Sequence, residues 1–379
     1  MAEPFKNRID AALLQQMAAH LRRADRSFRH AKFLSRATTG LDELELKARV
    51  LHVATALTDS LPDDFAAACE LLQAALAPAP APGDDDLSTM VTSPHGLAGW
   101  AIWPITEYVA QRGLDHPERA LAALHALTQR FTAEFAIRPF LLQHPQLTFE
   151  HLHRWLHDPS PHVRRLVSEG SRPRLPWGKQ LPDLIADPSP TLPLLRHLQH
   201  DPSPYVRRSV ANHLNDIAKD HPELVAAWIE AHAAAAAPPL LALLRHAART
   251  LIKKGHKRTL AAFGVAATFA GEATLRISPR RPVLGESCTL HVELHSRATV
   301  PQRLVVDYVV HRLLADGSTR QKIWKGWKLT LAPGESRTLQ KQHSLKPTTV
   351  RRNFAGRHRF ELVINGEIAV ADAVAFIAS

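Results

Sequence analysis

Asp158-Pro-Ser-Pro-His-Val-Arg-Arg-Leu-Val is repeated, with few changes, as Asp201-Pro-Ser-Pro-Tyr-Val-Arg-Arg-Ser-Val. The two copies begin 43 residues apart, and a partial copy, Asp187-Pro-Ser-Pro, lies between them. A repeat of roughly 40 to 47 residues is typical of solenoids built from HEAT-type helical pairs. We therefore predict that this part of the chain is a stack of helical pairs.

Each full copy also contains residues that favour the start of a helix. The Asp side chain can accept hydrogen bonds from the free amides of a first turn, and Pro is tolerated at the first helical position. The pairs Arg164/Arg165 and Arg207/Arg208 then occupy equivalent places in successive repeats. A row of guanidinium groups along a solenoid indicates a polyanionic partner.

The composition indicates a globular protein of more than one domain. The chain has 379 residues, of which 45% are hydrophobic and 22% charged, and this length exceeds that of one compact core. No apolar run has the length of a membrane span, and residues 1–8 lack the pattern of a secretory signal. The two cysteines, Cys69 and Cys288, do not suggest a disulfide framework or a zinc cluster. We expect a cytoplasmic monomer that makes no membrane contact.

The positive charge is concentrated in the second half of the chain. Residues 1–150 carry 14 Lys and Arg against 18 Asp and Glu, whereas residues 151–258 carry 16 against 9 and residues 271–379 carry 17 against 9. This asymmetry favours a nucleic-acid backbone lying across the second half. The alternative is a generally basic surface with no such ligand.

The periodicity changes from helical to alternating near residue 268. Before it, apolar residues recur at helical spacing, and Phe131 to Gln143 and Pro239 to Lys253 are each expected to form one helix. After it, six to seven short strands separated by turn residues are typical of an immunoglobulin-like sandwich. We predict a mainly α protein: an α-solenoid of HEAT-like repeats in residues 1–268, followed by an all-β sandwich in residues 269–379.

Three acids are the candidates for chemistry. The chain contains no Gly-rich phosphate loop, nucleophile elbow or zinc-protease motif, and we expect neither a metal nor a cofactor. Glu134, Glu169 and Asp216 recur at near-repeat spacing, each expected on the second helix of its pair, so they could converge on the face that carries the arginines. Alternatively, they pair with Arg138, Arg165 or Arg208, or face water.

The segment Gly170-Ser-Arg-Pro-Arg-Leu-Pro-Trp-Gly interrupts the repeat. It ends a helix early and places Trp177 on a proline-flanked loop. Trp177 is either a plug of the solenoid core or, beside Arg172 and Arg174, an exposed stacking surface.

Three segments together resemble the AlkC branch of the AlkC/AlkD family, bacterial DNA glycosylases built from HEAT-like repeats. They are Thr132-Ala-Glu-Phe-Ala-Ile-Arg-Pro-Phe, Val163-Arg-Arg-Leu-Val-Ser-Glu-Gly-Ser-Arg-Pro-Arg-Leu-Pro-Trp and Val206-Arg-Arg-Ser-Val-Ala-Asn-His-Leu-Asn-Asp. The resemblance covers about residues 1–265, and some members of the branch carry an appended immunoglobulin-like domain.

The resemblance implies hydrolysis of the N-glycosidic bond of cationic alkylated bases in double-stranded DNA. The substrates would be 3-methyladenine and, within the branch, also 3-methylcytosine, without full flipping of the base. Glu134, Glu169 and Asp216 correspond to the acids of the motifs, and Trp177 corresponds to the motif tryptophan, which we expect to contact the sugar or the base of the lesion. The chemistry agrees, because carboxylates can stabilise an oxocarbenium-like sugar and deprotonate water.

The DNA backbone is expected to be bound by both parts of the chain. The sandwich would act as a clamp on DNA, the alternative being a domain that only docks on the solenoid. A rival for the whole chain is a HEAT scaffold that binds protein or nucleic acid and catalyses nothing. The residues predicted to contact DNA are Arg164, Arg165, Arg172, Arg207, Arg208, Lys253, Lys254, Lys325, Arg351 and Arg352.

Overall fold

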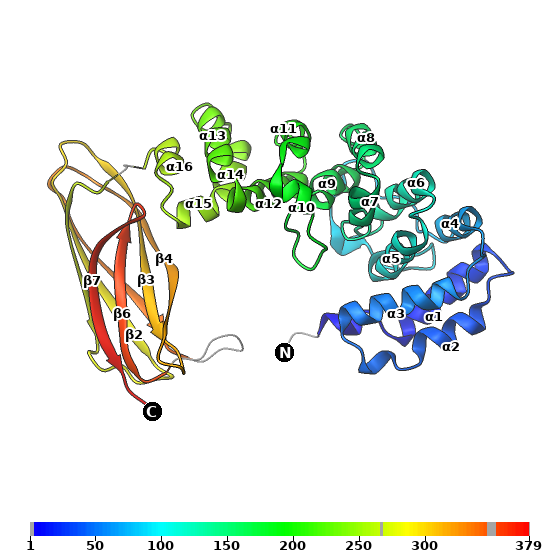
Figure 1. The fold of residues 1–379 in the computed structure, drawn as a ribbon, viewed down its shortest axis with the longest axis horizontal. Coiled ribbons are helices and arrows are strands. Elements are labelled where there is room, and N and C mark those ends of the chain that lie inside the picture. Colours follow the sequence, from blue (N-terminus) through cyan, green and yellow to red (C-terminus); the bar gives the residue numbers. More distant parts are fainter. Residues whose placement is uncertain (1–3, 266–267, 347–353, 379) are drawn as a thin grey trace. The chain divides into compact units, whose positions relative to one another are not determined.

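The computed structural model describes residues 4–265, 268–346 and 354–378. The chain forms two compact units, one made of Met1–Asp220 with Pro238–Ala247 and the other of His221–Ala237 with Ala248–Ser379. The first is helical, and the second combines helices with a β-sandwich (Figure 1). The predicted fold class, a helical-repeat solenoid followed by an immunoglobulin-like sandwich, is confirmed. Within the described ranges, no helix is both long enough and apolar enough to cross a membrane.

The first unit stacks its helices so that α9, α12 and α14 pack side by side. The core lies between successive helices and is made of leucine, valine and alanine at helical spacing. The helices of this unit are α1 (Ala11–Ala24), α2 (His30–Thr38), α3 (Leu46–Thr58), α4 (Phe65–Ala74), α5 (Ile102–Arg112), α6 (Pro117–Thr128), α7 (Arg138–Gln143), α8 (Pro145–Trp155), α9 (Pro161–Gly170), α10 (Pro182–Ala186), α11 (Leu192–Leu198), α12 (Pro204–Asp220) and α14 (Pro238–Ala247).

The repeated phrase starts α9 and α12 with a proline at the first helical position, as predicted. The expected role of its aspartate was wrong. Asp158 accepts from the amide of Ser160 at 2.8 Å, and Asp201 accepts from the amide of Ser203 at 2.9 Å. Both contacts lie before the helix, because the second proline moves the helix start three residues beyond the aspartate. The aspartates therefore shape the turn that enters the helix and do not cap its first turn.

Two predicted helices are shorter than expected. Residues 134–137 form turns, and α7 begins only at Arg138, so Glu134 does not lie on a helix as predicted. The cause is Pro139, which fits the first turn of a helix but not its interior. The helix expected from Pro239 to Lys253 is broken at Ala248 into α14 and α15.

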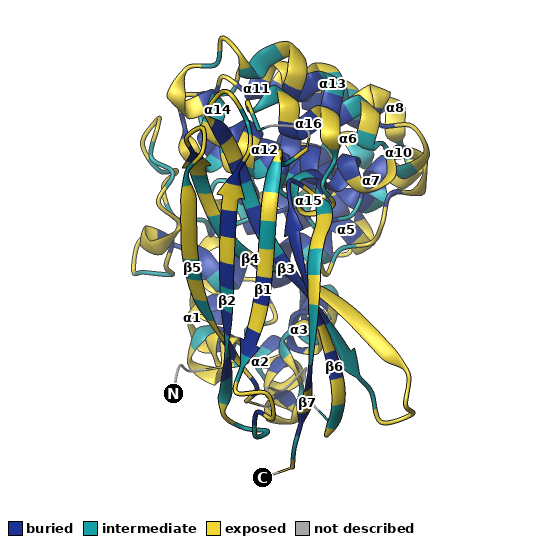
Figure 2. Cartoon of the chain, turned by 90° about the vertical axis from the view of Figure 1, so that its left-hand side faces the viewer, coloured by how far each residue is buried: buried dark blue, intermediate teal, exposed yellow. Residues whose placement is uncertain are grey.

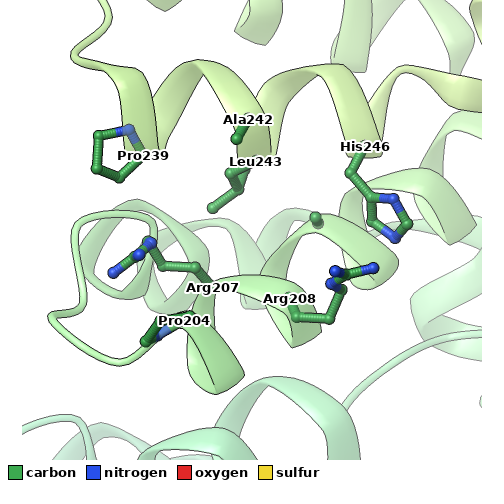
Figure 3. A pocket seen from close by; sticks show the side chains of 8 residues that line it. Pro204, Arg207, Arg208, Pro239, Ala242, Leu243 and His246 are labelled. Carbon is green, nitrogen blue, oxygen red and sulfur yellow. The ribbon is translucent and has the colours of Figure 1, made fainter.

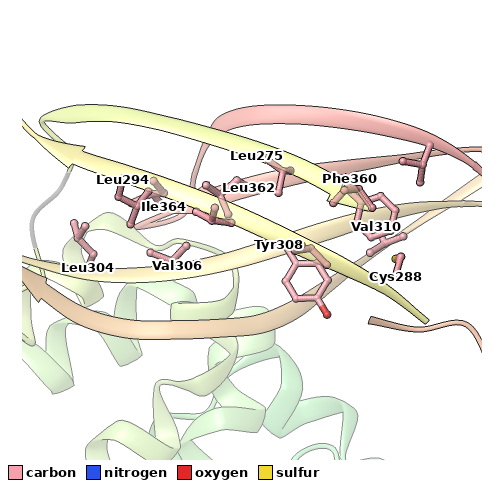
Figure 4. Close-up of a cluster of buried hydrophobic side chains, with 14 of the residues drawn as sticks. Leu275, Cys288, Leu294, Leu304, Val306, Tyr308, Val310, Phe360, Leu362 and Ile364 are labelled. Atoms are coloured by element: carbon pink, nitrogen blue, oxygen red, sulfur yellow. The ribbon is translucent and has the colours of Figure 1, made fainter. Parts of the chain in front are cut away.

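The described residues of the second unit form α13, α15 and α16 and seven antiparallel strands in two sheets, with the orders β1-β2-β5 and β4-β3-β6-β7. Figure 2 shows buried and exposed residues alternating along β1 and β2. The inward residues form one apolar core, part of which is drawn in Figure 4, including Leu294, Val306 and Phe360. The elements are α13 (Pro222–Ala233), α15 (Arg249–Lys253), α16 (Lys257–Ala262), β1 (Gly271–Ser278), β2 (Ser287–Ser296), β3 (Gln302–Leu313), β4 (Thr319–Leu331), β5 (Ser336–Ser344), β6 (Gly356–Ile364) and β7 (Glu367–Phe376).

Two glycines bring the helical and the β part of this unit into backbone contact. Gly255 follows α15 and Gly366 lies in the β6–β7 turn, both with positive φ. A Cβ added at either glycine would lie 2.1 to 2.2 Å from the Cα of the other, so only glycine fits at both positions. Lys257 and Glu367 form an ion pair of 2.8 Å beside this contact. The division at residues 268 and 269 into a glycosylase domain and a sandwich domain stays a prediction.

Candidate active site

The three candidate acids come together in the first unit. Glu169 lies on the last turn of α9, and Asp216 lies on the neighbouring helix α12. Glu134 lies in the turn that precedes α7. All three are buried, with exposed fractions of 8% for Glu134, 6% for Glu169 and 1% for Asp216. Carboxylates are rarely this buried unless they are paired.

Cationic side chains link the acids into a row of alternating charge. Arg165 Nη1 lies 2.9 Å from Glu134 Oε2, and its Nη2 lies 3.5 Å from Glu169 Oε1. Arg172 Nη1 lies 2.6 Å from Glu169 Oε1, and its Nη2 lies 2.7 Å from Asp216 Oδ2. We call Glu134, Arg165, Glu169, Arg172 and Asp216 the charge row. At its end, Lys219 Nζ lies 2.7 Å from Asp216 Oδ1.

Glu169 is the central acid of the charge row and is ionised at neutral pH. Its burial acts to raise its pKa, but the guanidinium groups of Arg165 and Arg172 outweigh this effect and hold the pKa below its usual value. The hydroxyl of Ser209, on α12, also donates to Glu169 Oε2 at 2.6 Å. Such fixed carboxylates can stabilise positive charge that develops on a nearby sugar.

Arg138 holds the loop that follows Glu169. Its side chain is fully buried and donates to three backbone carbonyls, at 2.9 Å to Gly170, 2.8 Å to Arg172 and 2.5 Å to Lys179. Burial lowers the pKa of Arg138 to about 10, which leaves it charged at neutral pH. These bonds fix both ends of the segment that carries Trp177 and orient the backbone of Arg172.

Trp177 is exposed, which removes the alternative that it plugs the core. Its side chain is 66% exposed, and its φ of 66° is unusual for a residue with a side chain. Lys47 Nζ donates to the carbonyl of Trp177 at 3.1 Å. A bulky aromatic side chain held in this conformation on a fixed loop is available to contact a ligand.

The predicted arginines separate into two kinds. Arg164 donates to the carbonyl of Asp158 at 2.7 Å and pairs with Asp201 at 2.7 Å. Arg207 likewise donates to the carbonyls of Asp201 and Pro202, at 2.5 and 2.8 Å. The first arginine of each repeated pair therefore fixes the entry turn of its own helix.

The second arginine of each pair faces a different environment. Arg165 belongs to the charge row, whereas Arg208 is exposed and, within the described part of the chain, has no hydrogen-bond or ion-pair partner. Arg172 is only 6% exposed and is occupied by two acids. Lys253 and Lys254, at the end of α15, and Lys325, on β4, are exposed. Arg351 and Arg352 lie outside the described residues.

Sequence reasoning missed several residues around the charge row. Tyr205 lies under Arg165, whose Cζ is 5.3 Å from the ring centroid, and meets the ring of His162 edge-on at 5.6 Å. His162 and Tyr205 occupy the same place in the two copies of the repeated phrase. This position differs between the two copies and lies between their shared proline and valine, which was the signal available for finding them. Ser209 and Lys219 gave no comparable signal.

Metal binding receives no support from the described residues, among which no three His, Cys, Asp or Glu side chains could hold an ion together. Two histidines of this region pair with acids. His151 contacts Glu118 at 2.8 Å, and His125 contacts Asp158 at 2.6 Å.

Comparison with known proteins places the chain in a family. Residues 128–251 match the family model described as DNA alkylation repair enzyme, and residues 272–376 match that of the C-terminal Ig-like domain of the uncharacterised protein YhaZ. The uncharacterised protein YhaZ of Bacillus subtilis is 37% identical over 366 residues, which cover 94% of each chain.

A solved structure matches almost the whole chain. It is that of the Pseudomonas fluorescens alkylpurine DNA glycosylase AlkC bound to DNA containing an abasic site analogue. The identity is 35%, the TM-score is 0.88, and the match covers 99% of this chain and 100% of the other. The chain therefore belongs to the AlkC branch of the DNA alkylation repair enzymes, with an Ig-like domain of the YhaZ type at its C-terminus.

Proposed function

We propose that the protein is a monofunctional DNA glycosylase that removes cationic alkylated bases, 3-methyladenine and also 3-methylcytosine, from double-stranded DNA. The observation that carries the proposal is the charge row. It holds three buried carboxylates in fixed positions on adjoining repeats, beside the exposed Trp177. The family of the chain supports the same activity, and a matching member was solved with DNA.

Departure of the alkylated base requires no strong general acid. An N3-alkylated base carries a positive charge, so the N-glycosidic bond can break with its electron pair moving to the base, which leaves neutral. The barrier lies in the oxocarbenium-like sugar and in the positioning of water. Water adds its oxygen to C1′ and gives up one proton to a carboxylate.

We assign the carboxylates to these tasks by their position. Asp216 and Glu169 flank the sugar of the lesion, one of them orienting the water, and Glu134 assists from the far end of the charge row. Trp177 contacts the sugar or the base from its loop, without full flipping of the nucleotide. Arg165 and Arg172 hold the acids in register, which is the role that their ion pairs support.

The decisive variant is Asp216→Asn. It removes one charge with almost no change of shape, and base release from methylated duplex should slow by about a hundredfold. Binding to duplex containing an abasic site should stay close to that of the parent protein. The matched control is Asp220→Asn, on the same helix, because Asp220 pairs with the partly exposed Arg174 at 2.7 Å and lies outside the charge row. Parent-like release by Asp216→Asn would contradict the assignment.

The ion pairs of the charge row are also what a non-catalytic scaffold would show, because each acid already has a cationic partner. The two functions differ in one measurement. Incubation of the unmodified protein with methylated duplex should release free 3-methyladenine, detected by chromatography of the small-molecule fraction. A scaffold binds the duplex and releases no base.

A further inference from the structure

A pocket of about 310 Å³ lies between α12 and α14, both of which belong to the first compact unit. Its lining includes Arg207 and Arg208 from α12 and Pro239, Ala242, Leu243 and His246 from α14 (Figure 3). The lining contains no acidic side chain among the described residues. The pocket is therefore cationic and lies outside the charge row, and the proposed reaction does not use it.

Arg208 is the cation that the pocket leaves available. The equivalent residue of the preceding copy, Arg165, is occupied by Glu134 and Glu169. Arg208 is exposed and makes no ion pair with any residue that the structure describes. An arginine without a partner loses side-chain entropy only when a ligand orders it, and a phosphate offers the acceptor geometry that its guanidinium fits.

His246 lies opposite Arg208 and has a fixed ring orientation. Figure 3 shows the two side chains facing each other from α14 and α12. The Nε2 atom of His246 lies 2.9 Å from Oδ1 of Asn212, one turn beyond Arg208 on α12. This bond holds the imidazole at the edge of the pocket and uses its Nε2–H, because the amide oxygen of Asn212 can only accept. The second ring nitrogen, Nδ1, donates to a phosphate when the imidazole is protonated, a form that a bound phosphate favours.

The rest of the pocket is suited to the apolar part of a nucleotide. Ala242 and Leu243 lie between the two ends of the pocket, and Pro239 lies near Arg207 (Figure 3). Arg207 is anchored by two carbonyls of its own entry turn and so presents a guanidinium of fixed position. Cationic groups beside a short apolar floor match the alternation of phosphate and deoxyribose along one DNA strand.

We propose that this pocket binds one phosphodiester of the DNA backbone, with Arg208 and His246 on the phosphate oxygens and the adjacent sugar on Ala242 and Pro239. The inference rests on the proposed function in taking DNA as the ligand. It adds His246 as a residue that positions the duplex, and it assigns the phosphate contact of the second repeated phrase to Arg208. Arg207 acts mainly by shaping the entry turn.

The test uses the full chain with Arg208→Ala, His246→Ala, the double variant and Arg245→Ala as the control. Arg245 is an exposed arginine of α14, next to His246 in sequence, and does not line the pocket. Affinity for a duplex containing an abasic site should fall roughly tenfold or more for each pocket variant, because each loses a hydrogen bond to a charged group. The logarithmic salt slope should become shallower by about 0.9 for Arg208→Ala. The effect of Arg245→Ala should be much smaller.

The double variant shows whether the two residues share one phosphate. If they do, the two losses should be less than additive. A series of duplexes with a single neutral methylphosphonate should then contain one position that weakens the parent protein and has no further effect on Arg208→Ala. Additive losses, or pocket variants that bind like Arg245→Ala, would overturn the proposal.

This failure is distinct from failure of the proposed function. Base release is measured separately, in single turnover with protein in excess. If the parent protein releases base but the pocket variants bind like the control, the glycosylase activity is supported and the phosphate-binding role of the pocket is rejected. If the parent protein releases no base but the pocket variants lose duplex binding, the phosphate-binding role of the pocket is supported and the glycosylase activity is rejected.

Discussion

Arg172 shows what a single residue contributes to the site. It lies on the loop after α9, and its guanidinium bridges an acid from each of two successive repeats, Glu169 and Asp216. The sequence identified all three residues as functional, but it predicted Arg172 on the DNA backbone. That geometry could not be read from spacing, because the bridge depends on how Arg138, 34 residues away, holds the carbonyl of Arg172. With both acids attached, Arg172 is better suited to positioning the acids than to binding phosphate.

The burial of His213 leads to a prediction of how the folding stability of the protein depends on pH. It is fully buried on α12, where its Nδ1 atom lies 2.9 Å from the carbonyl oxygen of Ser168, and burial lowers its pKa from 6.5 to about 4. Below pH 6.5 the unfolded chain binds a proton at this residue that the folded chain excludes. Stability should therefore fall by about 3 kcal/mol as the pH decreases from 6.5 to 4.

Urea denaturation across this pH range measures the effect. His213→Gln should lose that part of the pH dependence, whereas His200→Gln, a change at an exposed histidine, should keep it. Equal slopes for both variants would show that His213 does not titrate between the two states.

Replacement of Trp177 should reduce activity without reducing stability. Its side chain contributes little to the core because it is 66% exposed, and its positive φ is strained. Trp177→Ala should leave the thermal unfolding midpoint within a few degrees of the parent, while base release slows by roughly tenfold or more through loss of stacking. Thermal unfolding and single-turnover release, measured on the same samples, check both halves of this expectation. Unchanged release would remove Trp177 from the site.

At the scale of elements, some helix boundaries could be predicted from the sequence and others could not. A proline does begin α9 and α12, because proline both fits and fixes a first turn, but it is the second proline of the phrase and the expected aspartate cap was wrong. The end of α9 at Gly170 also agrees with the break predicted there, and a Cβ at this glycine would lie 2.6 Å from Ile137. The turn that carries Glu134 was missed, because hydrophobic periodicity alone does not register a proline such as Pro139.

Strand β4 shows the same limit in the sandwich. Its sequence interleaves lysine with Trp324 and Trp327, within the sandwich that was expected to clamp DNA. Both tryptophans pack against the core, and Lys322 and Lys325 face outward. The period of two is broken by a bulge where β3 pairs with β4, between Val306 and Asp307, and a bulge shifts which residues share a face.

The exposed lysines of β4 still support the proposed clamp. If the strand lies along DNA, the triple variant Lys322→Ala, Lys325→Ala and Lys328→Ala should make the logarithmic salt slope of binding shallower by about 0.9 for each phosphate that a lysine no longer neutralises. Arg276→Ala, at an exposed residue of β1 in the other sheet, is the control. A salt slope unchanged from that of the control would indicate that this strand does not contact DNA.

At the scale of the whole molecule, the order of a helical part and a sandwich was predictable, but the composition of the compact units was not. The second unit includes α13, α15 and α16, and thus begins well before the change of periodicity near residue 268. One contact that joins the helices to the sandwich is that between Gly255 and Gly366, whose backbones touch although they are far apart in the sequence. Such a contact leaves no pattern in the local sequence.

Gly366→Ala should loosen the second unit. The new methyl group would meet the backbone of Gly255, so the helices α15 and α16 should exchange their amide hydrogens faster than in the parent. Gly334→Ala is the matched control, because Gly334 also has a positive φ, of 69°, but has open space around it. The control carries the same backbone strain without the collision. Equal exchange in both variants would show that the glycine contact does not hold these helices.

The charge row also bears on how the protein searches DNA. Buried carboxylates beside a duplex would normally repel it, yet here each acid carries its own counterion from the protein. If the protein is the glycosylase proposed above, it would move along undamaged DNA without presenting unpaired negative charge to the strand. A neutral base offers nothing to exchange for Arg172, whereas a methylated, cationic base can compete for the same carboxylates. The charge row would thus exchange one of its cationic partners for the lesion, responding to the positive charge that the normal bases lack.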